Sequence, residues 1–262
     1  MTELPLPREA YDIWGSAPLR YVLVHGIGGD RTQWRALAEQ LATRAGVLAI
    51  DLAGHGAARH LSGPYRISRF AADVAEIAHL RAPDGAVLVG HSMGAAVCLE
   101  AAQMLGEAAN HVIGIDALLF PELFAAHAAR KSPAARVLLR TPLAARTIDS
   151  WVERFFVAPY DPAVRNAVRQ TMLNTPRPVL ADSVASLLRW QRDDALAASA
   201  VPVSILYAAR VKRPRQVRKL QRRCSITAFE RGGHFFFMEY PAETATAIKA
   251  ADRAANGPGA MP

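Results

Sequence analysis

The stretch Gly90-His91-Ser92-Met93-Gly94 decides the fold, because it joins two segments of different character. The apolar run before it, residues 86–89, predicts a buried strand, and the small-residue run after it, residues 95–99, predicts a helix. A serine between two glycines at such a junction is typical of a nucleophile elbow, a sharp turn that holds the hydroxyl clear of the backbone. The helix behind the turn would also direct N–H groups at the hydroxyl. The stretch therefore predicts a nucleophile at Ser92.

Strand and helix patterns alternate on both sides of this turn. Buried strands are predicted over residues 20–24, 47–50, 111–116, 203–207 and 224–229, and helices over 32–44, 68–80 and 215–221. This alternation is typical of an α/β fold with a mostly parallel, doubly wound sheet and helices on both faces. Ligands of such sheets bind at the carboxyl ends of strands. Four polar or glycine residues stand at predicted strand ends, namely Gly26, Asp51, Ser92 and Asp116.

The alternation stops between residues 117 and 200. This segment has several amphipathic helical runs, is punctuated by prolines and is rich in Leu, Phe and Trp, with no convincing strand. We predict one α/β core domain formed by residues 1–116 and 201–262, with residues 117–200 inserted as a helical cap, or lid. The apolar character of the cap favours a substrate with a hydrophobic acyl or alcohol part.

A glycine-rich loop after the first strand is predicted to complete the site around Ser92. Its glycines would let the loop bring the N–H of Ile27 opposite the N–H of Met93, and two such donors form an oxyanion hole. His25 and His55 are interpreted as structural histidines that hold this loop and the next one. A dinucleotide-binding fingerprint is rejected, because Arg31 stands where the third glycine would be required.

The general base is predicted on the loop after the last strand. There the run 232–237 places His234 behind two glycines and before three phenylalanines. The histidines of the chain show no metal-ligand spacing, so we expect neither a metal nor a cofactor. A substrate pocket is predicted beside these groups, lined by Gly26, Trp34, His91 and Phe235.

Four motifs in this order resemble those of the α/β-hydrolase fold superfamily: residues 25–29 (HGIGG), 51–56 (DLAGHG), 90–94 (GHSMG) and 233–235 (GHF), the last followed by Glu239-Tyr240-Pro241. The resemblance covers nearly the whole chain. It implies a serine hydrolase (carboxylesterase-like) acting on a small-molecule ester, with His234 as base to Ser92. Thioesterases, lactonases, C–C bond hydrolases and hydrolases of carrier-linked esters share these motifs, so they stay as alternatives. A non-catalytic ligand-binding protein of the same fold is an alternative of another class.

The acid of the triad departs from the common pattern of the superfamily. Many members carry it after the strand that corresponds to residues 203–207, but Val211 stands at that place and no Asp or Glu occurs between residues 195 and 229. Asp116, at the end of the preceding strand, is the predicted acid, and this resembles the arrangement in pancreatic lipases and some haloalkane dehalogenases. A strand-end cap is the structural alternative for Asp116, with Asp193 and Asp194 as reserve acids. A serine nucleophile argues against dehalogenase chemistry.

The net charge of +8 comes from one segment. Arg210–Arg223 holds eight basic residues and no acid, and these eight account for the whole excess. The segment is interpreted either as a solvated helix face or as a docking site for an acidic partner, such as a carrier protein or an anionic surface. The resemblance adds that some superfamily members dock acidic carriers through arginines. Few aromatic residues interleave these charges, so nucleic-acid binding is not expected.

The cellular setting is predicted from what the chain lacks. No secretory signal precedes the first strand, and no apolar stretch approaches the roughly 20 residues that span a bilayer. The two cysteines, Cys98 and Cys224, do not form a disulfide framework. We therefore expect a cytoplasmic protein that is not transmembrane, and its oligomeric state is left open.

Overall fold

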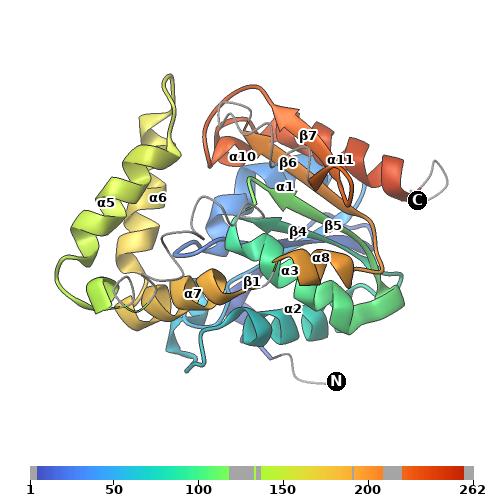
Figure 1. Ribbon diagram of the computed structural model, residues 1–262. Coiled ribbons are helices and arrows are strands. Elements are labelled where there is room, and N and C mark those ends of the chain that lie inside the picture. The colour runs from blue at the N-terminus through green and yellow to red at the C-terminus, as the bar shows by residue number, and fades with distance from the viewer. Residues whose placement is uncertain (1–4, 118–132, 134–136, 191, 209–219, 257–262) are drawn as a thin grey trace.

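A seven-stranded sheet forms the centre of the molecule (Figure 1). The computed structural model describes residues 5–117, 133, 137–190, 192–208 and 220–256. The strands are β1 (Tyr11–Trp14), β2 (Leu19–Val24), β3 (Gly46–Ile50), β4 (Ala86–His91), β5 (Ala109–Ile115), β6 (Val203–Ala208) and β7 (Ser225–Phe229). Their order in the sheet is β1-β3-β2-β4-β5-β6-β7, and all neighbours pair in parallel except β1 with β3. The predicted α/β class and the mostly parallel sheet are confirmed.

Helices cover both faces of this sheet. They are α1 (Arg35–Leu41), α2 (Ile67–Arg81), α3 (Met93–Leu105), α5 (Ala144–Phe155), α6 (Pro162–Asn174), α7 (Arg177–Arg189), α8 (Arg192–Ala197), α10 (Phe236–Glu239) and α11 (Pro241–Asn256). Short 3₁₀ helices add η1 (Arg8–Ala10), η2 (Arg31–Trp34), η3 (Gly56–His60) and η4 (Gly106–Ala108). Helices α2 and α3 pack on one face, while α1, α10 and α11 lie on the other.

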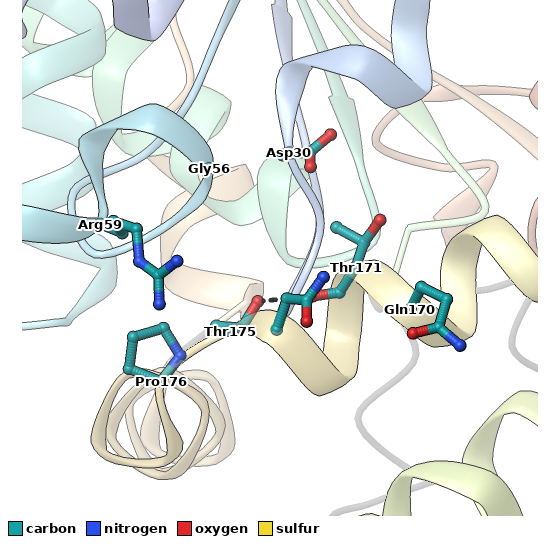
Figure 2. A pocket seen from close by; sticks show the side chains of 8 residues that line it. Asp30, Gly56, Arg59, Gln170, Thr171, Thr175 and Pro176 are labelled. Atoms are coloured by element: carbon teal, nitrogen blue, oxygen red, sulfur yellow. Dashed lines mark hydrogen bonds between the residues drawn. The ribbon is translucent and has the colours of Figure 1, made fainter.

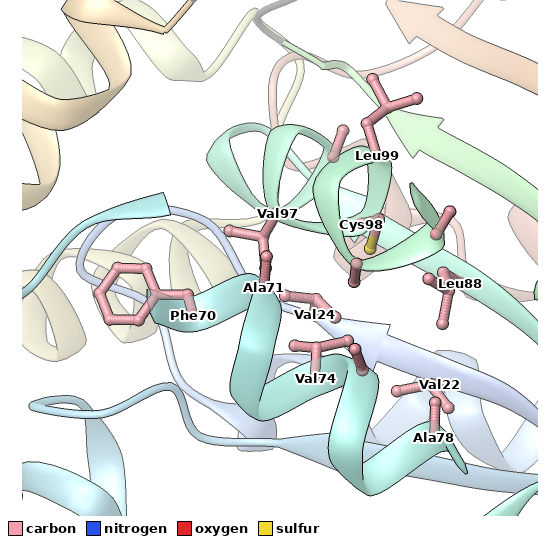
Figure 3. Packing of buried hydrophobic residues seen from close by; sticks show 14 of the residues in the cluster. Val22, Val24, Phe70, Ala71, Val74, Ala78, Leu88, Val97, Cys98 and Leu99 are labelled. Carbon is pink, nitrogen blue, oxygen red and sulfur yellow. The ribbon is translucent and has the colours of Figure 1, made fainter. Parts of the chain in front are cut away.

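The central strands are apolar on both sides, because successive side chains of a strand point to opposite faces. On β2, Val22 and Val24 join the cluster under α2 and α3, whereas Tyr21 and Leu23 join the cluster under α1 and α11. Figure 3 shows the first cluster, where Val74 of α2 and Val97 of α3 close over the β2 side chains. Strand β4, which ends at the predicted elbow, is covered from both faces in the same way, with Leu88 in the first cluster and Val87 and Val89 in the second.

Strand β1 was not predicted from the sequence. It pairs with β3 in antiparallel register, Tyr11 opposite Ile50 and Trp14 opposite Val47. The strand has only four residues and lies at the edge of the sheet, where Ile13 is left largely exposed. A short, partly exposed strand carries little hydrophobic periodicity, and for that reason the pattern did not reveal it.

Between β5 and β6, where a cap is predicted, the described residues form four helices, α5 to α8. Figure 1 shows α5 and α6 beside the sheet rather than on it. The second half of the segment is attached to the core: Ser186 Oγ accepts a hydrogen bond from the Ile67 N–H at 3.0 Å, and Trp190 Nε1 donates to Glu100 at 2.9 Å. Residues 118–132, 134–136 and 191 lie outside the described residues, so the cap boundaries at 117 and 200 stay a prediction.

The basic segment lies mostly outside the described part of the chain, as does most of the helix predicted over residues 215–221. Only residues 220–223 of the segment are described. Among the helices that the structure describes, none has the length and apolar character that a membrane crossing demands.

Candidate active site

Ser92 occupies a strained turn between β4 and α3. Its backbone has φ 53° and ψ −115°, outside the regions that a non-glycine residue ordinarily adopts. The two flanking glycines are required by close approach: a Cβ at Gly90 would clash with the backbone of Gly94, and a Cβ at Gly94 would clash with the carbonyl of Val24. The nucleophile elbow geometry that the sequence predicts is therefore present at residues 90–94.

Ser92 is buried at the apex of this turn. The residue is 7% exposed, and its own N–H donates to the Ile115 carbonyl at 3.0 Å, which anchors the turn to β5. Within the described part of the chain, the hydroxyl makes no hydrogen bond, and none joins it to His234. Such contacts are often long in a free enzyme and tighten when substrate binds.

His234 is paired with Asp116. Nδ1 of His234 lies 2.6 Å from Oδ2 of Asp116, and Oδ1 of Asp116 accepts the Ala208 N–H at 3.0 Å. The carboxylate therefore bridges the end of β6 and the loop between β7 and α10, residues 230–235, which carries His234 and is called the histidine loop below. Asp116 has φ 37°, and among the described non-glycine residues only Asp116 and Ser92 have positive φ. Backbone strain concentrated at these two positions is a feature of functional sites.

The histidine loop is held by helix α5. The His234 N–H donates to the carbonyl of Phe155, the last residue of α5, at 2.7 Å. A Cβ at Gly233 would clash with this carbonyl, so the glycine before the histidine is required for the contact. The ring of Phe155 also packs against His234, with the ring centroids 4.7 Å apart. Sequence reasoning missed Phe155, because nothing in its local pattern links α5 to a loop 79 positions away.

The glycine loop after β2 packs directly on the elbow. A Cβ at Gly26 would stand 3.1 Å from Cβ of Ser92 and 3.1 Å from Nδ1 of His91. Within the described residues, neither the Ile27 N–H nor the Met93 N–H donates to an acceptor. Ile27 lies in a loop, and Met93 is the first residue of α3, so its N–H has no partner inside the helix. Two unused donors next to a serine are what an oxyanion hole requires.

Buried polar groups tie this loop to the loop after β3. His25 Nε2 accepts the Leu52 N–H at 3.0 Å while Nδ1 donates to the Gly26 carbonyl at 2.8 Å. Burial lowers the pKa of His25, so the neutral ring that this pattern needs is favoured. His55 lies beside it, and burial lowers its pKa to about 3. The structural interpretation of His25 and His55 is confirmed by these contacts.

Arg31 and Asp51 form an ion pair that the sequence did not reveal. Asp51 is fully buried and accepts from the Arg31 N–H at 2.7 Å and from Arg31 Nη1 at 2.5 Å. It also accepts the Ala57 N–H at 2.7 Å. Arg31 further binds Asp12 of β1 through Nε at 3.0 Å. The residue that breaks the dinucleotide fingerprint thus has a structural role, which is to join the two loops and the edge strand.

The four residues predicted to line a substrate pocket occupy different surroundings. Gly26 lies against Ser92. His91 and Phe235 are 1% and 5% exposed and pack beside His234. Trp34 is fully buried in the core on the α1 side, 4.5 Å from the ring of Phe237. The structure brings the first three together around the serine and the histidine, and places Trp34 in the hydrophobic core.

A polar groove of about 260 Å³ lies beside the loops that follow β2 and β3 (Figure 2). Its walls come from the loop after β2, from η3 and from the end of α6, and are formed by Asp30, Gly56, Arg59, Gln170, Thr171, Asn174, Thr175 and Pro176. None of the four predicted pocket residues lines it. Over the described residues, no cluster of three or more His, Cys, Asp or Glu side chains could hold a metal ion.

Relatives share part of this chain. The 2-(acetamidomethylene)succinate hydrolase of Mesorhizobium japonicum is 32% identical over 102 residues, covering 39% of this chain and 36% of that protein. The sn-1-specific diacylglycerol lipase of Xenopus tropicalis is 31% identical over 111 residues, covering 41% of this chain and 34% of that protein. The matched segments span only 25% to 36% of the length of such curated relatives.

Solved structures resemble the whole fold. An esterase from Thermogutta terrifontis superposes with a TM-score of 0.82 at 23% identity, covering 94% of this chain and 93% of that one. An enol-lactonase from Burkholderia xenovorans gives 0.78 at 21% identity, covering 92% and 94%. At these identities the similarity establishes the fold alone. The family model for the alpha/beta hydrolase family matches residues 21–247, which is most of the chain. The strained serine elbow and the seven-stranded sheet thus have a common explanation, which is that the chain belongs to the alpha/beta hydrolase family.

Proposed function

We propose that this protein is a serine hydrolase that cleaves carboxylic esters through Ser92, His234 and Asp116. The observation that carries the proposal is the 2.6 Å contact between His234 Nδ1 and Asp116, formed at the strand ends beside an elbow serine. A carboxylate on Nδ1 leaves Nε2 as the nitrogen that can take a proton from a hydroxyl. Membership of the alpha/beta hydrolase family supports hydrolysis as the general class of reaction.

The proposed reaction has two half-reactions, and the same groups act in both. Ser92 Oγ attacks the acyl carbon while His234 takes its proton, and His234 then gives that proton to the leaving alcohol. Asp116 stabilises the imidazolium that forms between these two transfers. The N–H groups of Ile27 and Met93 hold the oxyanion, each contributing about 3–4 kcal/mol to barrier lowering. Water then attacks the acyl enzyme by the same route, which frees the acid and restores the Ser92 hydroxyl.

A hydrophobic substrate is supported by the side chains around His234. Phe155 and Phe235 lie 4.7 Å and 5.2 Å from the imidazole ring, measured between centroids. Phe156 stacks on Phe235 at 5.7 Å. These phenylalanine rings offer an apolar acyl or alcohol group a hydrophobic surface beside the imidazole.

The similar proteins include an enol-lactonase and a diacylglycerol lipase, so the similarity does not single out one kind of ester or leaving group. Hydrolysis of p-nitrophenyl esters with acyl chains from acetyl to decanoyl tests the proposal, with Ser92→Ala as the matched control. We expect turnover that rises with chain length and disappears in the variant. Rates no higher than those of Ser92→Ala for every ester, but high for a thioester or lactone panel, would move the proposal to those bonds. If the wild type is no faster than Ser92→Ala on the ester, thioester and lactone panels alike, the protein is not a serine hydrolase.

A further inference from the structure

Both backbone polar groups of His234 are held by parts of the chain that are remote in sequence. Its N–H donates to the Phe155 carbonyl at 2.7 Å, and its carbonyl accepts a hydrogen bond from Nε2 of His91 at 3.0 Å. The side chain then reaches Asp116 through Nδ1. His234 is therefore fixed at three points, and one of them is the residue directly before Ser92.

His91 is enclosed on all sides. It is 1% exposed, and its ring packs against His234, Phe235 and Phe237 with centroids 4.5 to 4.8 Å apart. Gly26 closes the other side, since a Cβ there would stand 3.1 Å from Nδ1. Within the described residues Nδ1 has no hydrogen-bond partner. The ring thus has one polar contact, and that contact is with the backbone of His234.

We propose that His91 is a positioning residue, which sets the distance between nucleophile and base through the hydrogen bond from its Nε2 to the His234 carbonyl. His91 and Ser92 are consecutive, so a shift of the histidine loop away from the elbow must break this bond. The inference rests on the proposed function for its catalytic meaning, because it concerns the geometry in which His234 receives the Ser92 proton.

The protonation state of His91 suits this role. A carbonyl accepts only, so Nε2 carries the hydrogen and Nδ1 is the unprotonated nitrogen of a neutral ring. Burial, together with the neighbouring His234, lowers the pKa of His91 well below its ordinary value. His91 therefore stays neutral, and it neither competes with His234 as a base nor places a second positive charge beside it.

Three substitutions separate the hydrogen bond from packing. His91→Gln keeps an N–H donor near the position of Nε2, whereas His91→Phe keeps the ring without a donor. His91→Asn is polar but too short to reach the carbonyl, and it replaces the Phe variant should that protein not fold. We expect His91→Phe and His91→Asn to lower kcat about 10- to 100-fold, because a displacement near 1 Å costs about 100-fold. KM should change less than about twofold, and His91→Gln should retain kcat within about threefold.

A second measurement does not depend on turnover. The proton between His234 Nδ1 and Asp116 should give a low-field NMR resonance in the wild type and in His91→Gln, and should be broadened or lost in His91→Phe and His91→Asn. The proposal is overturned by equal kcat values in His91→Gln and His91→Phe, or by an unchanged resonance in all variants. Should the wild type hydrolyse no ester and leave Ser92 unlabelled by a fluorophosphonate, the proposed function fails, and the resonance alone decides the positioning role.

Discussion

Nδ1 of His234 lies 2.6 Å from Oδ2 of Asp116, although 118 positions separate the two residues. Strand order explains the contact. Asp116 follows β5, and the next strands in the sheet are β6 and β7, after which the chain turns back along the same edge to His234. The carboxylate also accepts the Ala208 N–H at the end of β6, so it stays aligned with the histidine.

Asp116→Asn is expected to lower kcat about 10²- to 10⁴-fold, since loss of a triad acid costs up to about 10⁴. An asparagine amide keeps the shape of the side chain but removes the negative charge that favours the imidazolium. The measurement is ester turnover under saturating substrate, with Asp194→Asn as the control. Asp194 is exposed on α8, and its replacement should leave kcat unchanged. A larger loss of kcat in Asp194→Asn than in Asp116→Asn would show that Asp116 is not the acid of the triad.

Gly94→Ala is expected to destabilise the fold by about 3 kcal/mol, the upper part of the range for overpacking. The added methyl group would collide with the Val24 carbonyl, a backbone atom of a central strand that has no room to move. Gly63→Ala is the matched control, because Gly63 is exposed and an added Cβ has its nearest neighbour at 3.2 Å. Urea unfolding of both variants checks the difference. Equal free energies of unfolding would show that the elbow is not packed as described.

The stability of the protein is expected to depend on a buried carboxylate of α11. Asp252 accepts hydrogen bonds from Arg20 Nε at 2.8 Å and from the Tyr21 hydroxyl at 3.0 Å. Burial would raise the pKa of Asp252, but His111 and Arg20 lower it below its usual range. Asp252→Asn should therefore cost about 3 kcal/mol at pH 7, as the breaking of a buried pair does.

The sign of the pH dependence follows from the lowered pKa. The stabilisation by Asp252 is fully present above the unfolded-state pKa near 4 and is lost as the pH falls through the folded-state value. The stability difference between wild type and Asp252→Asn should thus narrow below about pH 4. Urea unfolding across this range measures it, and the exposed Asp84→Asn serves as the control. A difference that widens in acid would contradict the assignment.

Two interpretations of the basic segment, a solvated surface and a docking site for an acidic carrier that bears the acyl substrate, predict different kinetics. Charges of one sign raise association rates and lose their effect as salt shortens the screening length, about 8 Å at physiological ionic strength. Reversal of Arg215, Arg218 and Lys219 to Glu should lower kcat/KM for a carrier-bound ester but not for a small neutral ester. High salt should have the same selective effect. Equal kcat/KM values for the carrier-bound ester in wild type and variant would leave the segment as a solvated surface.

Much of the sheet could be predicted from the sequence, because its central strands are apolar on both faces and end in glycine-rich loops. The elbow at residues 90–94 could be predicted because the close approach of strand and helix leaves no room for a side chain at Gly90 or Gly94, so glycine is required at both positions. Strand β1 and helix α11 were not predicted. Both depend on tertiary contacts, the pairing of Tyr11 with Ile50 and the burial of Asp252 against Arg20.

The site was predictable only where a motif carries its own chemistry. Ser92 and His234 stand in such motifs. Phe155 holds the histidine loop through a backbone carbonyl that any residue possesses, and His91 holds it through Nε2, whose acceptor is a backbone carbonyl that no motif marks. Trp34 is one of the four residues predicted to line the pocket. Its helix instead turns it into the core, where the Phe237 ring covers it.

The reactivity of Ser92 tests the central proposal most directly. A fluorophosphonate reacts with a serine hydroxyl only where a base activates it and an oxyanion hole receives the phosphoryl oxygen. The proposed function predicts one adduct per chain, located by mass spectrometry on Ser92, and none in Ser92→Ala or after denaturation. A correctly folded wild-type protein that forms no adduct, or that carries it on another residue, would contradict the account.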